Sequence, residues 1–177
     1  MISKKTIMRT AFIVAVALST YGCIIKYSFT GASIDPSAKT FSVAYFPNNA
    51  QYVSPTLSNA MTDALIERME RQTRLSQVRE GADLSFEGEI TGWTNAPSMI
   101  SGADNGIGAG ATMNRLTITV KVQFNNAIEP QYNYSKSFSA YSDFPSSSDI
   151  IAEEGNLIPI IVEDLINQIF NAAVANW

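Results

Sequence analysis

The chain has 177 residues, of which 46% are hydrophobic and 16% are charged, so it can bury a core and is not a disordered protein. It contains no histidine and a single cysteine, which excludes serine–histidine and cysteine–histidine catalysis, histidine-bound metal sites and a disulfide within one chain. Its acidic balance, a net charge of −4, argues against nonspecific nucleic-acid binding, which needs a basic surface.

The N-terminal segment has the pattern of a bacterial lipoprotein signal. Three basic residues precede an uncharged apolar run at 11–18, and Gly22 leads directly into Cys23. The run is too short to span a bilayer, which takes about 20 residues, but it has the length of a secretory signal core. We therefore predict that residues 1–22 are removed and that Cys23 is the lipid attachment site. The alternatives are an ordinary secretory peptide with a free cysteine, or an uncleaved anchor.

The predicted mature chain, residues 23–177, has the size of a single domain. Removal of three of the 12 basic residues and none of the 16 acidic ones leaves nine against 16, a net charge of −7. A diacylglyceryl group plus an amide-linked acyl chain (palmitate or similar) exceeds the two-chain threshold for stable anchoring. We expect a periplasm-facing protein that is lipid-anchored in the envelope.

The first part of the mature chain predicts two short strands and a helix. Apolar and polar residues alternate over 27–30 and again over 41–45, which is typical of strands. Ser54 is then a predicted N-cap with Pro55 at the first helical position. The helix that follows has a core-facing stripe at spacings of three and four, made of Leu57, Met61, Ala64, Leu65 and Met69.

The second part predicts three longer strands and a terminal helix. Alternation runs over 84–92, most clearly over 116–124, and again over 134–144. The last helix has a stripe of Ile158, Ile161, Val162, Leu165, Ile169 and Ala173. Because Gly155 and Pro159 disfavour a helix interior, its start is expected near Asn156, or an earlier turn is kinked against it. The pattern predicts an α+β, two-layer sandwich: two amphipathic helices on one face of a mainly antiparallel sheet of four or more strands.

The connection over 96–113 is unusual because it combines glycines with large apolar side chains. Four glycines share this segment with Met99, Ile100, Ile107 and Met113. Long hairpin loops are uncommon unless they are functional or disordered. We interpret the four apolar side chains as a partner-contact loop; the alternative is a loop that covers the edge of the domain's own core.

Three further groups of residues resemble functional sites. Glu87 and Glu89 share a strand face at a separation that glycosidase carboxylates can have, but a solvated strand face is the stronger interpretation. The glycines of 106–110 lack the Lys-Ser/Thr ending of a phosphate loop. A solvated helix end, rather than a phosphate site, is the favoured interpretation of the basic cluster Arg68, Arg71, Arg74 and Arg79. We predict a protein that is not an enzyme and has no cofactor or metal.

Several runs together resemble a known family. They are Tyr-Ser-Phe-Thr-Gly-Ala-Ser-Ile at 27–34, Phe-Pro-Asn-Asn-Ala at 46–50, Phe-Glu-Gly-Glu-Ile-Thr-Gly at 86–92, the strand at 114–122 and the C-terminal run at 164–177. In this order they are similar to the LPS-assembly lipoprotein family (LptE), in particular to the branch found in Bacteroidota. The resemblance covers nearly the whole mature chain.

The resemblance implies a function that composition does not supply. Members sit at the outer membrane, plug a large β-barrel partner, LptD, and help it place lipopolysaccharide in the outer leaflet. Members are also thought to bind lipopolysaccharide through basic residues, for which Arg115, Lys121 and Lys136 are the candidates here. The rival hypothesis is a periplasmic lipoprotein adaptor of a secretion pore, similar to curli-secretion components, which would form homo-oligomeric rings.

Overall fold

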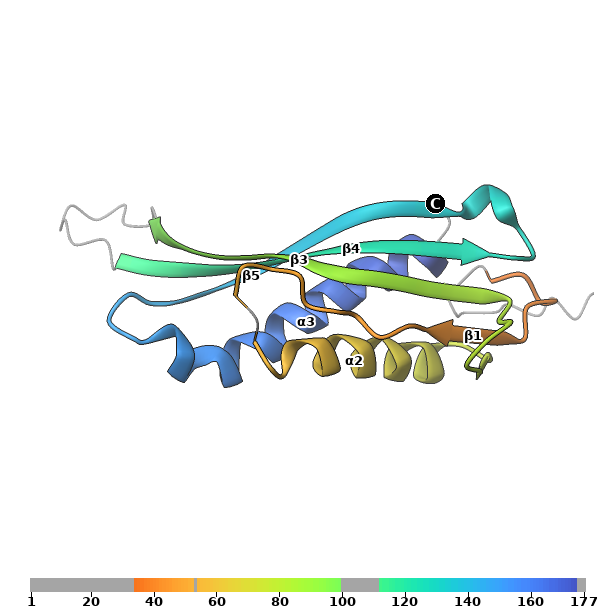
Figure 1. Ribbon diagram of the computed structural model, residues 1–177, viewed down its shortest axis with the longest axis horizontal. Coiled ribbons are helices and arrows are strands. Elements are labelled where there is room, and N and C mark those ends of the chain that lie inside the picture. The colour runs from red at the N-terminus through yellow and green to blue at the C-terminus, as the bar shows by residue number, and fades with distance from the viewer. Residues whose placement is uncertain (1–33, 53, 100–111, 175–177) are drawn as a thin grey trace, which may run out of the picture.

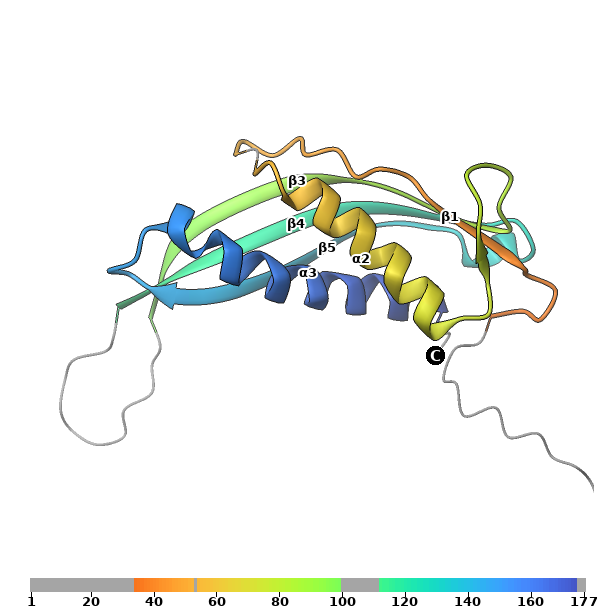
Figure 2. The same cartoon turned by 90° about the horizontal axis from the view of Figure 1, so that it is seen from below.

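The computed structural model describes residues 34–52, 54–99 and 112–174. Five strands form one mixed sheet in the order β2-β1-β3-β4-β5, and both helices cover the same face of it (Figures 1 and 2). The strands β3 (Leu84–Met99), β4 (Thr112–Asn126) and β5 (Tyr134–Pro145) are antiparallel. The predicted α+β two-layer sandwich is therefore confirmed.

On the other side of β3 the strands pair in parallel. β1 (Thr40–Val43) runs parallel to β3 and also to β2 (Ser76–Gln77), a two-residue strand that sequence alternation did not predict. Beyond β1 the chain stays beside β3, because Ile90 N donates to the carbonyl of Pro47 at 2.9 Å. The predicted strand at 27–30 lies outside the described residues.

Asp83 fixes the start of β1 to the start of β3. Its Oδ2 accepts hydrogen bonds from Lys39 N at 2.7 Å, Thr40 N at 3.0 Å and Thr40 Oγ1 at 3.0 Å. These bonds, the one from the Lys39 amide first, lower the pKa of Asp83 below its usual value, because they favour the ionised carboxylate.

We expect Asp83→Asn to destabilise the protein at neutral pH and to have little effect in acid. Because the pKa of Asp83 is lower in the folded protein than in the unfolded chain, its ionisation stabilises the fold. This stabilisation is complete at pH values above the unfolded-chain pKa of about 3.9, and it is lost as the pH falls through the folded-state pKa. Urea unfolding of both proteins from pH 7 down to pH 3 measures this, and the two curves should converge below about pH 4. A difference that does not change with pH would contradict it.

The first helix, α2 (Leu57–Gln72), begins two residues later than predicted. The predicted N-cap, Ser54, is wrong: Thr56 occupies the cap position and makes no side-chain cap hydrogen bond. Ser54 is instead buried, and its Oγ donates to Glu154 Oε2 of the other helix at 3.2 Å. The predicted stripe is confirmed, since Leu57, Met61, Leu65 and Met69 are fully buried.

The terminal helix, α3 (Ile150–Val174), begins about six residues before the predicted start. Asp149 caps it, with Ile151 N donating to Asp149 Oδ1 at 2.8 Å. Pro159 lies inside the helix and lacks the N–H that would bond the carbonyl of Gly155. Since a Cβ added at Gly155 would meet nothing within 4 Å, this part of the helix is uncrowded. The helix continues beyond Pro159 to Val174, so the loss of one backbone hydrogen bond does not end it.

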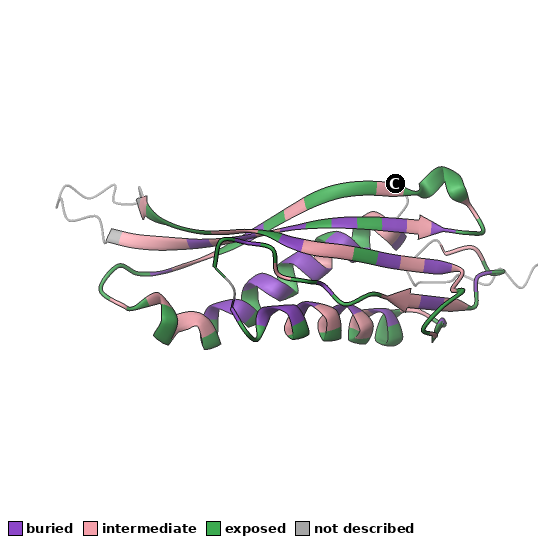
Figure 3. Cartoon of the chain, in the orientation of Figure 1, coloured by how far each residue is buried: buried purple, intermediate pink, exposed green. Residues whose placement is uncertain are grey.

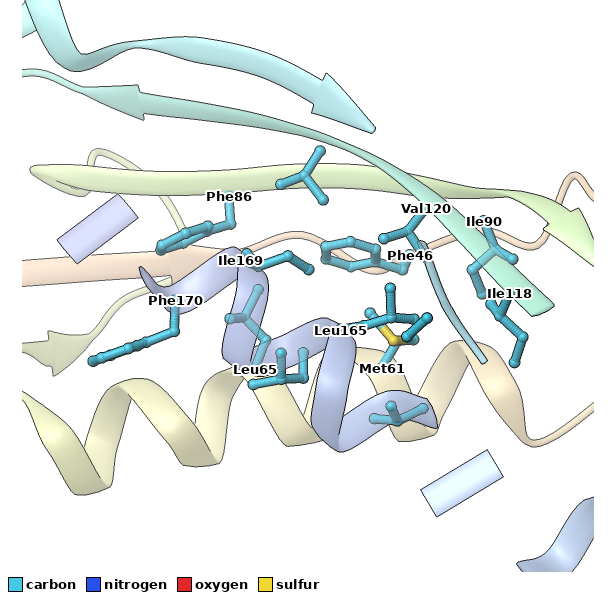
Figure 4. Packing of buried hydrophobic residues seen from close by; sticks show 14 of the residues in the cluster. Phe46, Met61, Leu65, Phe86, Ile90, Ile118, Val120, Leu165, Ile169 and Phe170 are labelled. Carbon is cyan, nitrogen blue, oxygen red and sulfur yellow. The ribbon is translucent and has the colours of Figure 1, made fainter. Parts of the chain in front are cut away.

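The core lies between the helices and the sheet (Figure 3). Its sheet side is formed by the fully buried side chains of Phe86, Ile90, Leu116, Ile118, Val120 and Val122. Figure 4 shows the Phe46 ring between the strands and the helices, close to Leu165 and Met61. Phe46 is itself 0% exposed and comes from the segment that follows β1.

A register shift between Ile90 and Gly92 changes which β3 residues face the core. The sequence predicts Gly92 on the same face as Leu84 and Phe86, but this is wrong. The extra residue places Gly92 opposite Thr119 and Trp93 opposite the buried Ile118. Trp93 consequently packs against the core, with its ring 4.9 Å from that of Tyr52.

Candidate partner and lipid interface

The second face of the sheet carries no helix in the described part of the chain (Figure 1). Its side chains alternate with the buried ones of β3, β4 and β5, so they are mainly hydroxyl, amide and charged groups. We call this surface the uncovered face. It is formed by Glu87, Glu89 and Thr94 of β3, Arg115, Thr117, Thr119, Lys121 and Gln123 of β4, and Ser135, Ser137, Ser139, Tyr141 and Asp143 of β5.

Arg115, the first predicted lipopolysaccharide contact, is engaged within the domain. Its Nε lies 2.7 Å from Asp143 Oδ1 and its Nη2 lies 2.9 Å from Asp143 Oδ2, across the β4–β5 pair. The guanidinium also stacks 3.7 Å from the centre of the Tyr141 ring. The bonds from Arg115 lower the pKa of Asp143, so both groups stay charged at neutral pH. A lipid phosphate would have to compete with this carboxylate.

Lys121 and Lys136, the other two candidates, lie on opposite faces. Lys121 belongs to the uncovered face, is exposed, and stands in register between Glu89 and Ser137. Lys136 pairs in register with the buried Val122, so it projects on the helix side, with its Nζ 5.3 Å from the centre of the Tyr134 ring. Arg115 and Lys121 are six residues apart on one strand, about 20 Å. The structure does not bring the three together.

Glu87 and Glu89 both lie on the uncovered face, as the sequence predicts. Glu87 is exposed, and Glu89 Oε2 accepts a hydrogen bond from Asn49 Nδ2 at 2.8 Å. Glu89 is itself half-buried. Among the described residues, no three Asp or Glu side chains come together to hold a metal ion.

The predicted partner-contact loop is shorter than expected. β3 continues to Met99 and β4 starts at Thr112, with the pairing unbroken from Gly92 onward. Met113 is therefore a strand residue, half-buried, and opposite Ser98. Ile100 and Ile107 lie outside the described residues, as does Cys23. In Figure 1 the ends of β3 and β4 and the orange start of the described chain lie at opposite ends of the long axis.

A groove between α2 and α3, with a volume of about 400 Å³, was not predicted from the sequence. Apolar and charged residues both line it: Ala60, Ala64, Glu67, Arg68, Arg71, Pro159, Val162, Glu163 and Ile166. Of the predicted basic cluster, Arg71 is ion-paired with Glu67 and both side chains are largely exposed. Arg74 and Arg79 follow the helix and are exposed. This arrangement fits a solvated helix end.

The chain is similar in structure to several solved proteins. The protein CT253 from Chlamydia trachomatis superposes with a TM-score of 0.54 at 9% identity, covering 79% of this chain and all of that one. A minor lipoprotein from Acinetobacter baumannii gives a TM-score of 0.46 at 14% identity, covering 76% and 91% of the two chains. PelC from Paraburkholderia phytofirmans, a dodecamer, gives 0.47 at 10% identity, covering 81% and 95%. At these identities the first match shows the fold alone.

The family assignment rests on a match between the sequence and a family model. No curated protein sequence matches the chain significantly. A family model described as LptE, lipopolysaccharide-assembly, matches residues 38–173, which include every strand and helix of the fold from β1 to α3 except the last residue of α3. The match confirms the resemblance inferred from the sequence runs. The chain belongs to the lipopolysaccharide-assembly (LptE) family.

Proposed function

We propose that this protein is an outer-membrane lipoprotein subunit of a lipopolysaccharide translocon, which plugs an LptD-type β-barrel and assists its assembly. The family match over residues 38–173 is the observation that carries the proposal. The proposal assigns residues 1–22 to a cleaved signal and 23–177 to one periplasmic domain tethered through an acylated Cys23. It gives the protein no catalytic role.

The two faces of the domain suit different surroundings. The side chains of the helix-covered face are buried in the core, whereas the uncovered face exposes hydroxyl, amide and charged groups. The interior of a large membrane barrel is polar and hydrated. The uncovered face can therefore lie against it without exposing apolar side chains to water. The helices would then face the opposite wall or the periplasm.

The proposal predicts a one-to-one complex. Full-length, acylated protein is purified from native cells in mild detergent through a C-terminal tag, and the mass and composition of the complex are measured. We expect one copy with one outer-membrane β-barrel, and Cys23→Ser should release the protein from the membrane fraction. A ring made only of this chain would instead support the secretion-adaptor alternative, and recovery of neither would contradict the proposal.

Direct contact with lipopolysaccharide is a separate prediction, which the two lysines test as a matched pair. If lipid phosphates bind the uncovered face, Lys121→Glu should weaken binding at least tenfold, because it replaces an attractive charge by a repulsive one. Lys136→Glu makes the same change on the other face and should alter binding less than twofold. Binding of the purified variants to lipopolysaccharide in detergent measures both. Equal effects would show that neither lysine marks a specific contact.

A further inference from the structure

The groove between α2 and α3 is elongated. It lies on the helix side of the sheet, away from the uncovered face, where the two helices run side by side (Figure 2). Its lining residues extend from Ala60 to Arg71 on α2 and from Pro159 to Ile166 on α3, which spans about 10–16 Å of helix at 1.5 Å per residue. Its volume of about 400 Å³ falls within the range of small-ligand sites, so the groove suits a narrow, chain-like ligand.

Part of the groove offers an apolar surface to such a ligand. Val162 and Ile166 are buried, and Ala60 and Ala64 are half-buried. The small side chains of the two alanines leave the groove open on the α2 side. An alkyl chain laid along these residues removes apolar surface from water, which is favourable. The volume of the groove is about that of a single long alkyl chain.

The charges that line the groove are only partly paired with each other. Arg71 and Glu67 form an ion pair on α2. Within the described part of the chain, Arg68 of α2 and Glu163 of α3 make neither an ion pair nor a side-chain hydrogen bond. Arg68 is also half-buried, unlike the exposed Arg71. The groove therefore presents one open positive group and one open negative group, which complement a ligand that carries one charge of each sign.

Pro159 adds a hydrogen-bond acceptor close to Glu163. Because proline has no N–H, the carbonyl of Gly155 lacks its usual helical donor. Gly155 is exposed, and the space beside its Cα is open. Glu163 lies one turn after Pro159, and long side chains on a helix lean toward its N-terminus, which is toward this carbonyl. A primary ammonium has three N–H donors, so it can bond both the carboxylate and the carbonyl.

We propose that the groove binds a zwitterionic phospholipid with one acyl chain and a primary amine in its headgroup. Arg68 holds the phosphate through a charge-assisted, two-pronged contact. Glu163 and the carbonyl of Gly155 hold the ammonium, and the acyl chain lies along Ala64 and Ile166. This inference goes beyond the proposed function, because the site lies on the opposite side of the sheet from the uncovered face.

The test uses two matched pairs of charge reversals. Arg68→Glu changes the open arginine of the groove, and Arg74→Glu makes the same change at an exposed position outside it. Glu163→Lys and its exposed neighbour Asp164→Lys form the second pair. The full-length, acylated protein and each variant are titrated in mild detergent with lysophosphatidylethanolamine, and bound lipid is counted by native mass spectrometry. Circular dichroism checks folding.

Two further lipids with the same acyl chain test the headgroup. Lysophosphatidylcholine keeps both charges but has no N–H on its nitrogen, and lysophosphatidylglycerol has no amine. Both should bind more weakly than lysophosphatidylethanolamine, because neither can donate to the Gly155 carbonyl and Glu163 through an ammonium. A groove that only shelters an acyl chain would not distinguish the three lipids.

We expect one bound lysophosphatidylethanolamine per protein, with binding weakened at least about tenfold by Arg68→Glu and Glu163→Lys and less than about twofold by the two control substitutions. The proposal is overturned if no lipid is bound, if the three headgroups bind equally, or if the members of each matched pair behave alike. It is also overturned if added lipopolysaccharide displaces the phospholipid. Since binding is measured on the protein alone, these outcomes do not depend on whether it forms a complex with a barrel.

Discussion

Replacement of Gly88 by alanine is expected to lower the free energy of unfolding by about 3 kcal/mol. A Cβ at this position would collide with the Phe46 ring and lie 2.8 Å from the carbonyl oxygen of Lys121. The backbone cannot move away, because β3 is paired with β4 on one side and with the segment after β1 on the other. Phe46 is fully buried, so its ring has no free space to enter. Urea unfolding followed by circular dichroism measures the change.

Gly155→Ala is the matched control for this substitution. Nothing lies within 4 Å of a Cβ there, and the position is exposed in a helix. Alanine should therefore stabilise the protein by about 0.5–1 kcal/mol. If steric conflict with Phe46 is the cause at Gly88, the double variant Gly88→Ala/Phe46→Leu should lose less stability than the two single losses added together. If the two losses of unfolding free energy simply add, Phe46 is not the group with which the alanine side chain collides.

The parts of the fold that depend on local periodicity were predictable from the sequence. The alternation over 116–124 places five side chains in the core, and all five are buried in β4. The stripes of both helices are confirmed for the same reason, since one apolar face must pack on the sheet.

Other features depend on contacts distant in sequence, so periodicity could not reveal them. The register shift after Ile90 and the extension of β3 to Met99 exist because β4 pairs along that length. β2 has only two residues and is held by β1, so it leaves no alternating pattern. α3 starts earlier than predicted, because the cap that Asp149 supplies holds the first turn despite Gly155 and Pro159.

The candidate site was predictable only in part. The ion pair between Arg115 and Asp143 requires the β4–β5 register, which no local pattern gives. The face of Lys136 could have been found, because it has the same parity as Tyr134, Phe138 and Ala140, which pack toward the core.

The length and composition of α3 fit a membrane-spanning helix. It has 25 residues with a mean hydropathy of 1.4 over its most apolar stretch, but half of that stretch is buried inside the domain. Leu165 is 0% exposed and faces the sheet, whereas Ile160 is 52% exposed (Figure 4 shows Leu165). Leu165→Ala should therefore cost about 3–4 kcal/mol of unfolding free energy, and Ile160→Ala less than about 0.5 kcal/mol.

The two substitutions distinguish a helix packed in the core from a helix inserted in a membrane, because different faces of the helix are buried in the two cases. A core helix loses stability only where it faces the sheet, so the effects of the two substitutions must differ severalfold in urea unfolding. A helix inserted in a bilayer has apolar surroundings on every side, and truncation of Ile160 would then weaken membrane association of a Cys23→Ser variant. Equal losses for Leu165→Ala and Ile160→Ala, together with such membrane association, would contradict the packing of α3 against the sheet.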